Sequence, residues 1–182
     1  GQTIYIVAAK HNPNAAAELA AFNQKFGLPT CTTRTLAATT ALPLPAASKT
    51  GCELVIAYSS ATGTLTSTAP AYDSGWATEI ALDVQWSHAM APLARIVLVE
   101  APDASVNKLT SAIRLANAMG PGVVSMSFGA AEGSWSSALD SAFAAPNMTY
   151  LAATGAWGAG VMWPSLPANV LGVGGPTLTY SG

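Results

Sequence analysis

The sequence predicts an α/β protein in which a doubly wound parallel sheet carries helices on both faces. Six short segments are nearly continuous runs of apolar residues, the pattern of strands buried on both faces of a parallel sheet. Amphipathic segments of helical length separate most of these runs. The length of 182 residues suits one domain with a sizeable core, and neither a repeat nor a domain boundary divides residues 1–182.

The predicted strands are spread along the whole chain, and each is a short run in which apolar side chains dominate. They cover residues 3–8, 53–58, 95–100, 123–127, 148–153 and 169–173. The segments 37–50 and 61–70 have no such run. They are rich in small residues, so we expect long surface loops there.

Four helices are predicted between these strands. They cover residues 15–26, 75–91, 104–119 and 135–145. Residues that favour helix ends mark the first three: Asn12, Pro13 and Gly27, then Asp73 or Ser74 and Pro92, then Gly120. The third helix also has an apolar stripe at helical spacing, formed by Val106, Leu109, Ile113 and Ala116.

The charge of the chain excludes several partners. Seven basic and nine acidic residues give a formal net charge of -2, and charged residues make up only 9% of the chain. The basic residues are scattered, so no patch can neutralise a run of phosphates or bind an acidic membrane surface. Proline, glycine, serine and threonine interrupt the stretches without charge, which excludes a membrane span of about 20 apolar residues. We therefore expect no nucleic-acid partner and no membrane span.

The first residue and the two cysteines predict a processed protein outside the cell. Gly1 begins the chain without an initiator methionine or a signal-like segment, so we expect a chain trimmed or cut from a longer precursor. Cys31 and Cys52 flank a loop, and nothing near them has metal-ligand spacing. A disulfide is the favoured interpretation, and it indicates an extracellular location. Two small buried thiols are the alternative.

Cofactor and metal chemistry have no recognisable motif. His11 and His88 lie far apart in the sequence, and no zinc-binding or calcium-binding pattern is present. The segment 155–160 is rich in glycine, but Pro164 and Pro167 interrupt the helix that a phosphate site would need after it. We therefore expect neither a cofactor nor a metal.

One pair of side chains suggests acid–base chemistry. Glu79 and Asp83 lie four residues apart on the second predicted helix, so both carboxylates leave one face, with Trp76 and Trp86 on the same stripe. Like charges repel and aromatic neighbours desolvate them, so at least one pKa should be raised. Such a carboxylate can act as a base at low pH. The alternative is a pair of acids that occurs by chance.

The helix with this pair closely resembles the active-site helix of the sedolisins, the serine-carboxyl peptidases. The stretch that carries the resemblance is GWATEIALDVQWSHAMAP, residues 75–92. Similar stretches are GQTIYIV at 1–7, FGLP at 26–29, IVLVEA at 96–101, VVSMSFG at 123–129 and residues 170–178. The resemblance covers essentially the whole of this chain, but it covers only about the first half of a sedolisin catalytic domain. It implies a subtilisin-like fold in truncated form.

The resemblance also implies roles for individual residues. Glu79 would be the general base toward a nucleophilic serine, and Asp83 would orient it. Ala156 occupies the position of an aspartate that helps to stabilise the oxyanion, which a methyl group cannot do. The segment with the nucleophilic serine would lie beyond Gly182. Three residues at a strand end would border the substrate cleft, where a peptide can lie as an added strand: Ser127, Phe128 and Gly129.

Three functions fit these observations. The one we favour is an extracellular module without proteolytic activity that self-assembles or binds peptides or proteins. The second is the processed N-terminal chain of an active acid endopeptidase whose serine is on a second chain. The third is a small-molecule-binding α/β domain unrelated to peptidases. Because a shortened sheet leaves an edge and apolar faces uncovered, we expect a homo-oligomer or a second chain that covers them.

Overall fold

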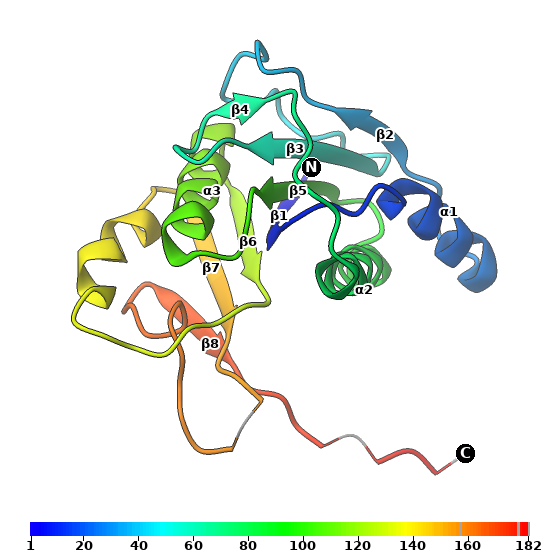
Figure 1. Ribbon diagram of the computed structural model, residues 1–182. Helices are drawn as coiled ribbons and strands as arrows, with labels where there is room; N and C mark the ends of the chain where they lie inside the picture. Colours follow the sequence, from blue (N-terminus) through cyan, green and yellow to red (C-terminus); the bar gives the residue numbers. More distant parts are fainter. Residues whose placement is uncertain (157, 178, 182) are drawn as a thin grey trace.

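The computed structural model describes residues 1–156, 158–177 and 179–181, and its centre is one mainly parallel sheet (Figure 1). The described residues form the strands β1 (Thr3–Ala9), β2 (Thr32–Thr35), β3 (Glu53–Ser59), β4 (Leu65–Thr66), β5 (Arg95–Ala101), β6 (Gly122–Met126), β7 (Met148–Ala153) and β8 (Val170–Val173). Neighbours follow the order β2-β3-β5-β1-β6-β7-β8, and these pairs are parallel. The short β4 pairs antiparallel with β3.

Helices cover both faces of this sheet (Figure 1). The described helices are α1 (Ala15–Phe26), α2 (Ser74–Met90), α3 (Val106–Met119) and the 3-10 helix η1 (Ser136–Phe143). Side chains alternate along β1, so Tyr5 and Val7 join the core under α3 and η1, whereas Ile6 and Ala8 join the core under α1 and α2. The predicted α/β class with helices on both faces is confirmed.

The predicted strands are all present at nearly the predicted positions. The structure differs from the prediction in two additional strands and in the type of the fourth helix. β2 is exposed at all four residues and has no apolar run, and it forms because it pairs in register with β3. β4 lies within the segment 61–70 that we predicted as a loop. Residues 136–143 form a 3-10 helix, which fits a short segment in which serine and aspartate side chains compete for backbone hydrogen bonds.

The predicted helix ends are largely confirmed. α1 begins at Ala15 as predicted, but its N-cap position is held by Asn14 and not by Asn12. Asn12 instead closes the preceding turn, because its Oδ1 accepts a hydrogen bond from the backbone N–H of Asn14 at 2.8 Å. Gly27 ends α1 in the left-handed conformation with φ 65°. Asp73, one of the two predicted caps, caps α2.

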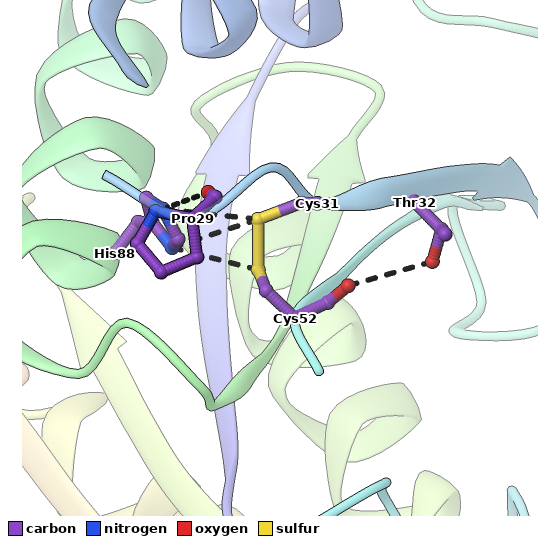
Figure 2. The surroundings of a disulfide bond; sticks show 5 residues. All are labelled: Pro29, Cys31, Thr32, Cys52 and His88. Carbon is purple, nitrogen blue, oxygen red and sulfur yellow. Dashed lines mark hydrogen bonds between the residues drawn. A yellow bond between two sulfur atoms is a disulfide. The ribbon is translucent and has the colours of Figure 1, made fainter. Parts of the chain in front are cut away.

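The two cysteines form a disulfide, which confirms the first of the two interpretations. Cys31 lies just before β2 and Cys52 just before β3 (Figure 2). The backbone N–H of Thr32 donates a hydrogen bond to the Cys52 carbonyl oxygen at 3.1 Å. The covalent bond therefore ties the exposed strand β2 to the sheet. Within the described ranges, no helix combines the length and the apolar character that crossing a membrane requires.

Candidate functional site

The helix α2 holds the predicted pair of carboxyl groups in place. The Asp73 carboxylate accepts a hydrogen bond from a backbone N–H of the first turn at 2.9 Å and so fixes the start of the helix. Ile80 and Val84 are buried against the sheet, which sets the rotation of the helix about its axis. Glu79 and Asp83 each precede one of these residues, so both side chains lie half-buried at the border of the packed face.

Ser127 contacts the pair from the sheet. It directly follows β6, and its hydroxyl group donates a hydrogen bond to Asp83 Oδ1 at 2.9 Å. The second oxygen, Asp83 Oδ2, is buried and accepts no hydrogen bond from the described residues. The Glu79 carboxyl group lies one helical turn earlier and acts on Asp83 through its negative charge.

These surroundings favour the protonated form of Asp83. Burial is the main cause, and the charge of Glu79 adds to it. The hydrogen bond from Ser127 lowers the pKa, whereas a hydrogen bond between the carboxyl groups of Asp83 and Glu79 raises it slightly. Together they raise the pKa of Asp83 from 3.8 to about 7. Asp83 therefore holds a proton in acidic solution, and Oδ2, which accepts no hydrogen bond from the described residues, is the oxygen available to carry it. The direction agrees with the prediction, and the structure places the shift on Asp83.

Two hollows adjoin one another beside the pair, and residues 127–129, the cleft segment, line both. The smaller has a volume of about 410 Å³ and is lined by Asp73, Gly75, Trp76, Glu79, Ser127, Phe128 and Gly129. The larger has a volume of about 680 Å³ and is lined by Ser125, Met126, Ser127, Phe128, Gly129, Leu151, Ala152, Ala153, Gly155, Ala156, Met162, Val173, Gly174 and Gly175. Small and apolar side chains dominate the larger hollow.

The cleft segment is anchored at both of its ends. Met126, just before it, is the last residue of β6 that pairs with the neighbouring strands. Ala130, just after it, exchanges two backbone hydrogen bonds with Trp163, at 2.9 and 3.1 Å. The ring of Phe128 packs against the buried ring of Trp163, with 6.2 Å between the centroids. The segment is thus held in position beyond the paired part of the sheet, where an extended ligand can approach it.

The structure brings most of the predicted site residues together. Glu79, with Asp83 behind it, lies at the smaller hollow, next to the cleft segment. Ala156 is exposed and lines the larger hollow. Cys31 and Cys52 line neither hollow. Gly182, beyond which the resemblance places the nucleophilic serine, lies outside the described residues.

Two polar contacts were not predicted from the sequence. The bond between Ser127 and Asp83 joins residues 44 positions apart, and no local pattern links them. Glu100 is fully buried, and its carboxylate accepts hydrogen bonds from His11 Nδ1 at 2.7 Å and from the backbone N–H of Asn12 at 3.2 Å. A glutamate within an apolar strand was the signal for the second contact, because a buried charge needs a partner.

Comparison with known proteins matches the chain to a solved structure. No protein-family model matches the chain. No curated protein matches it. Among solved structures, Pseudomonas sedolisin, a serine-carboxyl proteinase complexed with two molecules of pseudo-iodotyrostatin, superimposes with a TM-score of 0.72. The two chains are 22% identical, and the match covers 99% of this chain and 50% of the sedolisin chain.

The fold of this chain is sedolisin-like. The chain spans half the length of the solved sedolisin chain that it matches. The fold expected from the helix resemblance is therefore confirmed on independent grounds, since the superposition covers 99% of this chain with a TM-score of 0.72. A likeness at this level of identity concerns the fold, and the chemistry of the sedolisin-like chain has to be argued from its own residues.

Proposed function

We propose that this sedolisin-like chain binds extended peptides or protein segments along the cleft segment and does not hydrolyse them on its own. The observation that carries the proposal is the position of residues 127–129, which line both hollows and lie beyond the paired part of β6. A peptide that adds to this segment as a strand would point successive side chains in alternate directions, and the two hollows along the segment can receive some of them.

Two features argue against hydrolysis by the described residues. By resemblance, Ala156 stands where a sedolisin has the aspartate that stabilises the oxyanion, and losing such a donor lowers the rate by about 100-fold to 1,000-fold. Ser127 is hydrogen-bonded to the acid pair, but its partner Asp83 is itself protonated in acidic solution. A protonated carboxyl group cannot take the serine proton, so Ser127 has no base in that contact.

A second candidate function is supported by the electrostatics of the pair. The chain would be the processed N-terminal part of an active acid endopeptidase, with the nucleophilic serine on another chain. Asp83 keeps its proton up to a pH of about 7. It can therefore support a charged Glu79 without adding a second negative charge, and Glu79 would serve as the general base toward a serine supplied from outside this chain.

We also propose that the protein is extracellular and assembles with a second chain or with itself. The disulfide fits an oxidising compartment outside the cytosol. Leu171 and Val173 lie on β8, the last strand in the described sheet order, and 63% and 49% of their surfaces are exposed. Apolar residues on an edge strand favour pairing with another chain, which would cover them.

The binding proposal is tested with two probes, pseudo-iodotyrostatin and an unfolded protein substrate. We expect both to shift the backbone amide NMR signals of residues 127–129. Phe128→Ala should weaken binding about tenfold, because Phe128 lines both hollows. The matched control is Phe26→Ala, an exposed phenylalanine on α1, which should bind like the unchanged chain. Absence of binding, or shifts confined to other residues, would show that the cleft segment is not a binding site.

Hydrolysis distinguishes the two candidate functions. The purified chain should not cleave the unfolded substrate near pH 4, and serine-dependent cleavage would disprove the favoured function. Native mass spectrometry of the protein from its source then shows whether a different chain accompanies it. If it does, Ala156→Asp should raise the cleavage rate of the two-chain complex, whereas copies of one 18.4 kDa chain support the binding module.

A further inference from the structure

The disulfide has a buried histidine directly beside it (Figure 2). His88 lies in the last turn of α2 and is fully buried. Its Nδ1 atom is 3.5 Å from Cys31 Sγ and 3.5 Å from Cys52 Sγ. The two sulfur atoms and a ring nitrogen lie within 4.8 Å of one another, although the three residues come from different parts of the chain.

The protonation of the ring follows from its other contact. His88 Nε2 is 2.9 Å from the carbonyl oxygen of Pro29, which can only accept, so Nε2 carries a hydrogen and donates it (Figure 2). Histidine binds a metal as the neutral imidazole. A neutral ring with a hydrogen on Nε2 has none on Nδ1. The nitrogen near both sulfurs is therefore the one with an available lone pair.

This arrangement matches a metal-binding histidine whose second ring nitrogen already donates to a hydrogen-bond acceptor. Histidines that bind metals through one ring nitrogen usually donate the other N–H to a carbonyl or carboxylate, as His88 does to Pro29. For tetrahedral zinc with Zn–S about 2.3 Å and Zn–N about 2.0 Å, the nitrogen–sulfur separation is about 3.5 Å. Both nitrogen–sulfur distances here are 3.5 Å. Zinc binding would therefore change only the distance between the two sulfur atoms, which would rise to about 3.8 Å.

We propose that Cys31, Cys52 and His88 form a zinc-binding site when the disulfide is reduced. Two thiolates and one imidazole are ligands that zinc prefers, and three protein ligands leave a fourth position for water. Cys31 is half-buried, so the group is in contact with solvent on the Cys31 side. Cys31 also precedes the exposed strand β2, which lies at the end of the described sheet order.

The chemistry makes the disulfide and the metal mutually exclusive. A dithiol reduces the bond: it becomes a cyclic disulfide, and the two cysteines become thiols. Zinc then replaces the proton of each thiol, and two protons are released. In the reverse direction an external disulfide takes up two electrons and two protons and becomes two thiols. The Cys31–Cys52 bond re-forms, so the ion loses both sulfur ligands and is released. The site is thus a metal site of the reduced protein only.

The test compares the oxidised and the reduced chain of residues 1–182. The dithiol is removed by anaerobic desalting, and Co²⁺ serves as a coloured substitute for Zn²⁺. We expect one Co²⁺ per reduced chain, a thiolate-to-cobalt charge-transfer band and the visible bands of tetrahedral cobalt. Zn²⁺ should displace the Co²⁺ and remove these bands. The oxidised chain should show neither band. If the reduced chain is unfolded without metal, Zn²⁺ should restore its circular dichroism spectrum.

Variants separate the proposed site from nonspecific binding to two thiols. His88→Gln should weaken Zn²⁺ binding about 100-fold, because removing only the hydrogen-bond partner of a metal ligand already lowers metal affinity by up to about 100-fold. His11→Gln is the matched control at the other histidine and should bind like the unchanged chain. Should His88→Gln not fold, Cys31→Ser keeps the histidine and one thiolate, so it should bind Zn²⁺ more weakly and lose about half of the charge-transfer intensity. The proposal would be overturned if reduced His88→Gln or Cys31→Ser bound the metal as tightly as the reduced wild type. It would also be overturned if the oxidised chain bound the metal equally well, or if the reduced chain showed no thiolate-to-cobalt band.

Discussion

Replacing Asp83 by asparagine tests the electrostatics of the acid pair. Burial and the Glu79 charge raise the pKa of Asp83 to about 7, from 3.8 in an unfolded chain. Between these two values the folded chain binds a proton that the unfolded chain has released. The stability contributed by this group is therefore fully present below a pH of about 4 and falls as the pH rises to about 7.

The size of this fall follows from the two pKa values. Moving a pKa from 3.8 to about 7 corresponds to on the order of 4 kcal/mol in the free energy of unfolding. Asp83→Asn keeps the shape of the side chain and an oxygen that accepts from Ser127, but it cannot ionise. We expect the variant to match the wild type near pH 4 and to exceed its stability near pH 7 by up to that amount.

The assay is urea unfolding of both proteins at several pH values from 4 to 7. Asp140→Asn, at an exposed aspartate of η1, is the matched control and should keep the pH dependence of the wild type. If wild type and Asp83→Asn lose stability equally between pH 4 and pH 7, Asp83 is not the group that binds the proton, and the argument for a protonated partner of Glu79 fails.

Three further changes have expected outcomes. Ser127→Ala removes the hydrogen bond that lowers the pKa of Asp83, so that pKa should rise further in a carbon NMR titration of the carboxyl group, and an unchanged value would contradict this. Trp163→Ala should cost about 3–5 kcal/mol in urea unfolding because its ring is buried, whereas the exposed Trp86→Ala should stay within about 0.5 kcal/mol. Replacing both cysteines by serine should cost about 3 kcal/mol, given a separation of 21 residues, and no loss would mean that the link does not restrict the unfolded chain.

The strands that could be predicted from sequence are those buried on both faces. β1 and β5 are buried at nearly every residue, so apolar residues run without interruption and the strand signal is strong. β2 is polar and fully exposed, and its extended form depends on pairing with β3 and on the disulfide beside it. Such an edge strand has no signal in its own residues, because the energy that forms it comes from a neighbour distant in sequence.

The same limit applies to the site. Helical spacing placed Glu79 and Asp83 on one face, since four residues complete about one turn. Their contact with Ser127 depends on how α2 packs against β6, and helical spacing does not contain that information. For His88 the sequence shows no ligand pattern, but the ring lies against a disulfide whose cysteines are 57 and 36 residues away.

The helix α2 carries both the acid pair and the buried histidine, and its geometry keeps the two proposals independent. Asp83 and His88 are five residues apart, which is a rise of about 7.5 Å and a rotation of about 140° around the helix axis. Their side chains share no hydrogen-bond partner: Asp83 bonds to Ser127, and His88 bonds to Pro29. Effects at sites without shared partners add. A zinc-binding defect in His88→Gln that also moved the titration of Asp83 would therefore mean that the helix had shifted as a whole, and not that a metal ligand had been lost.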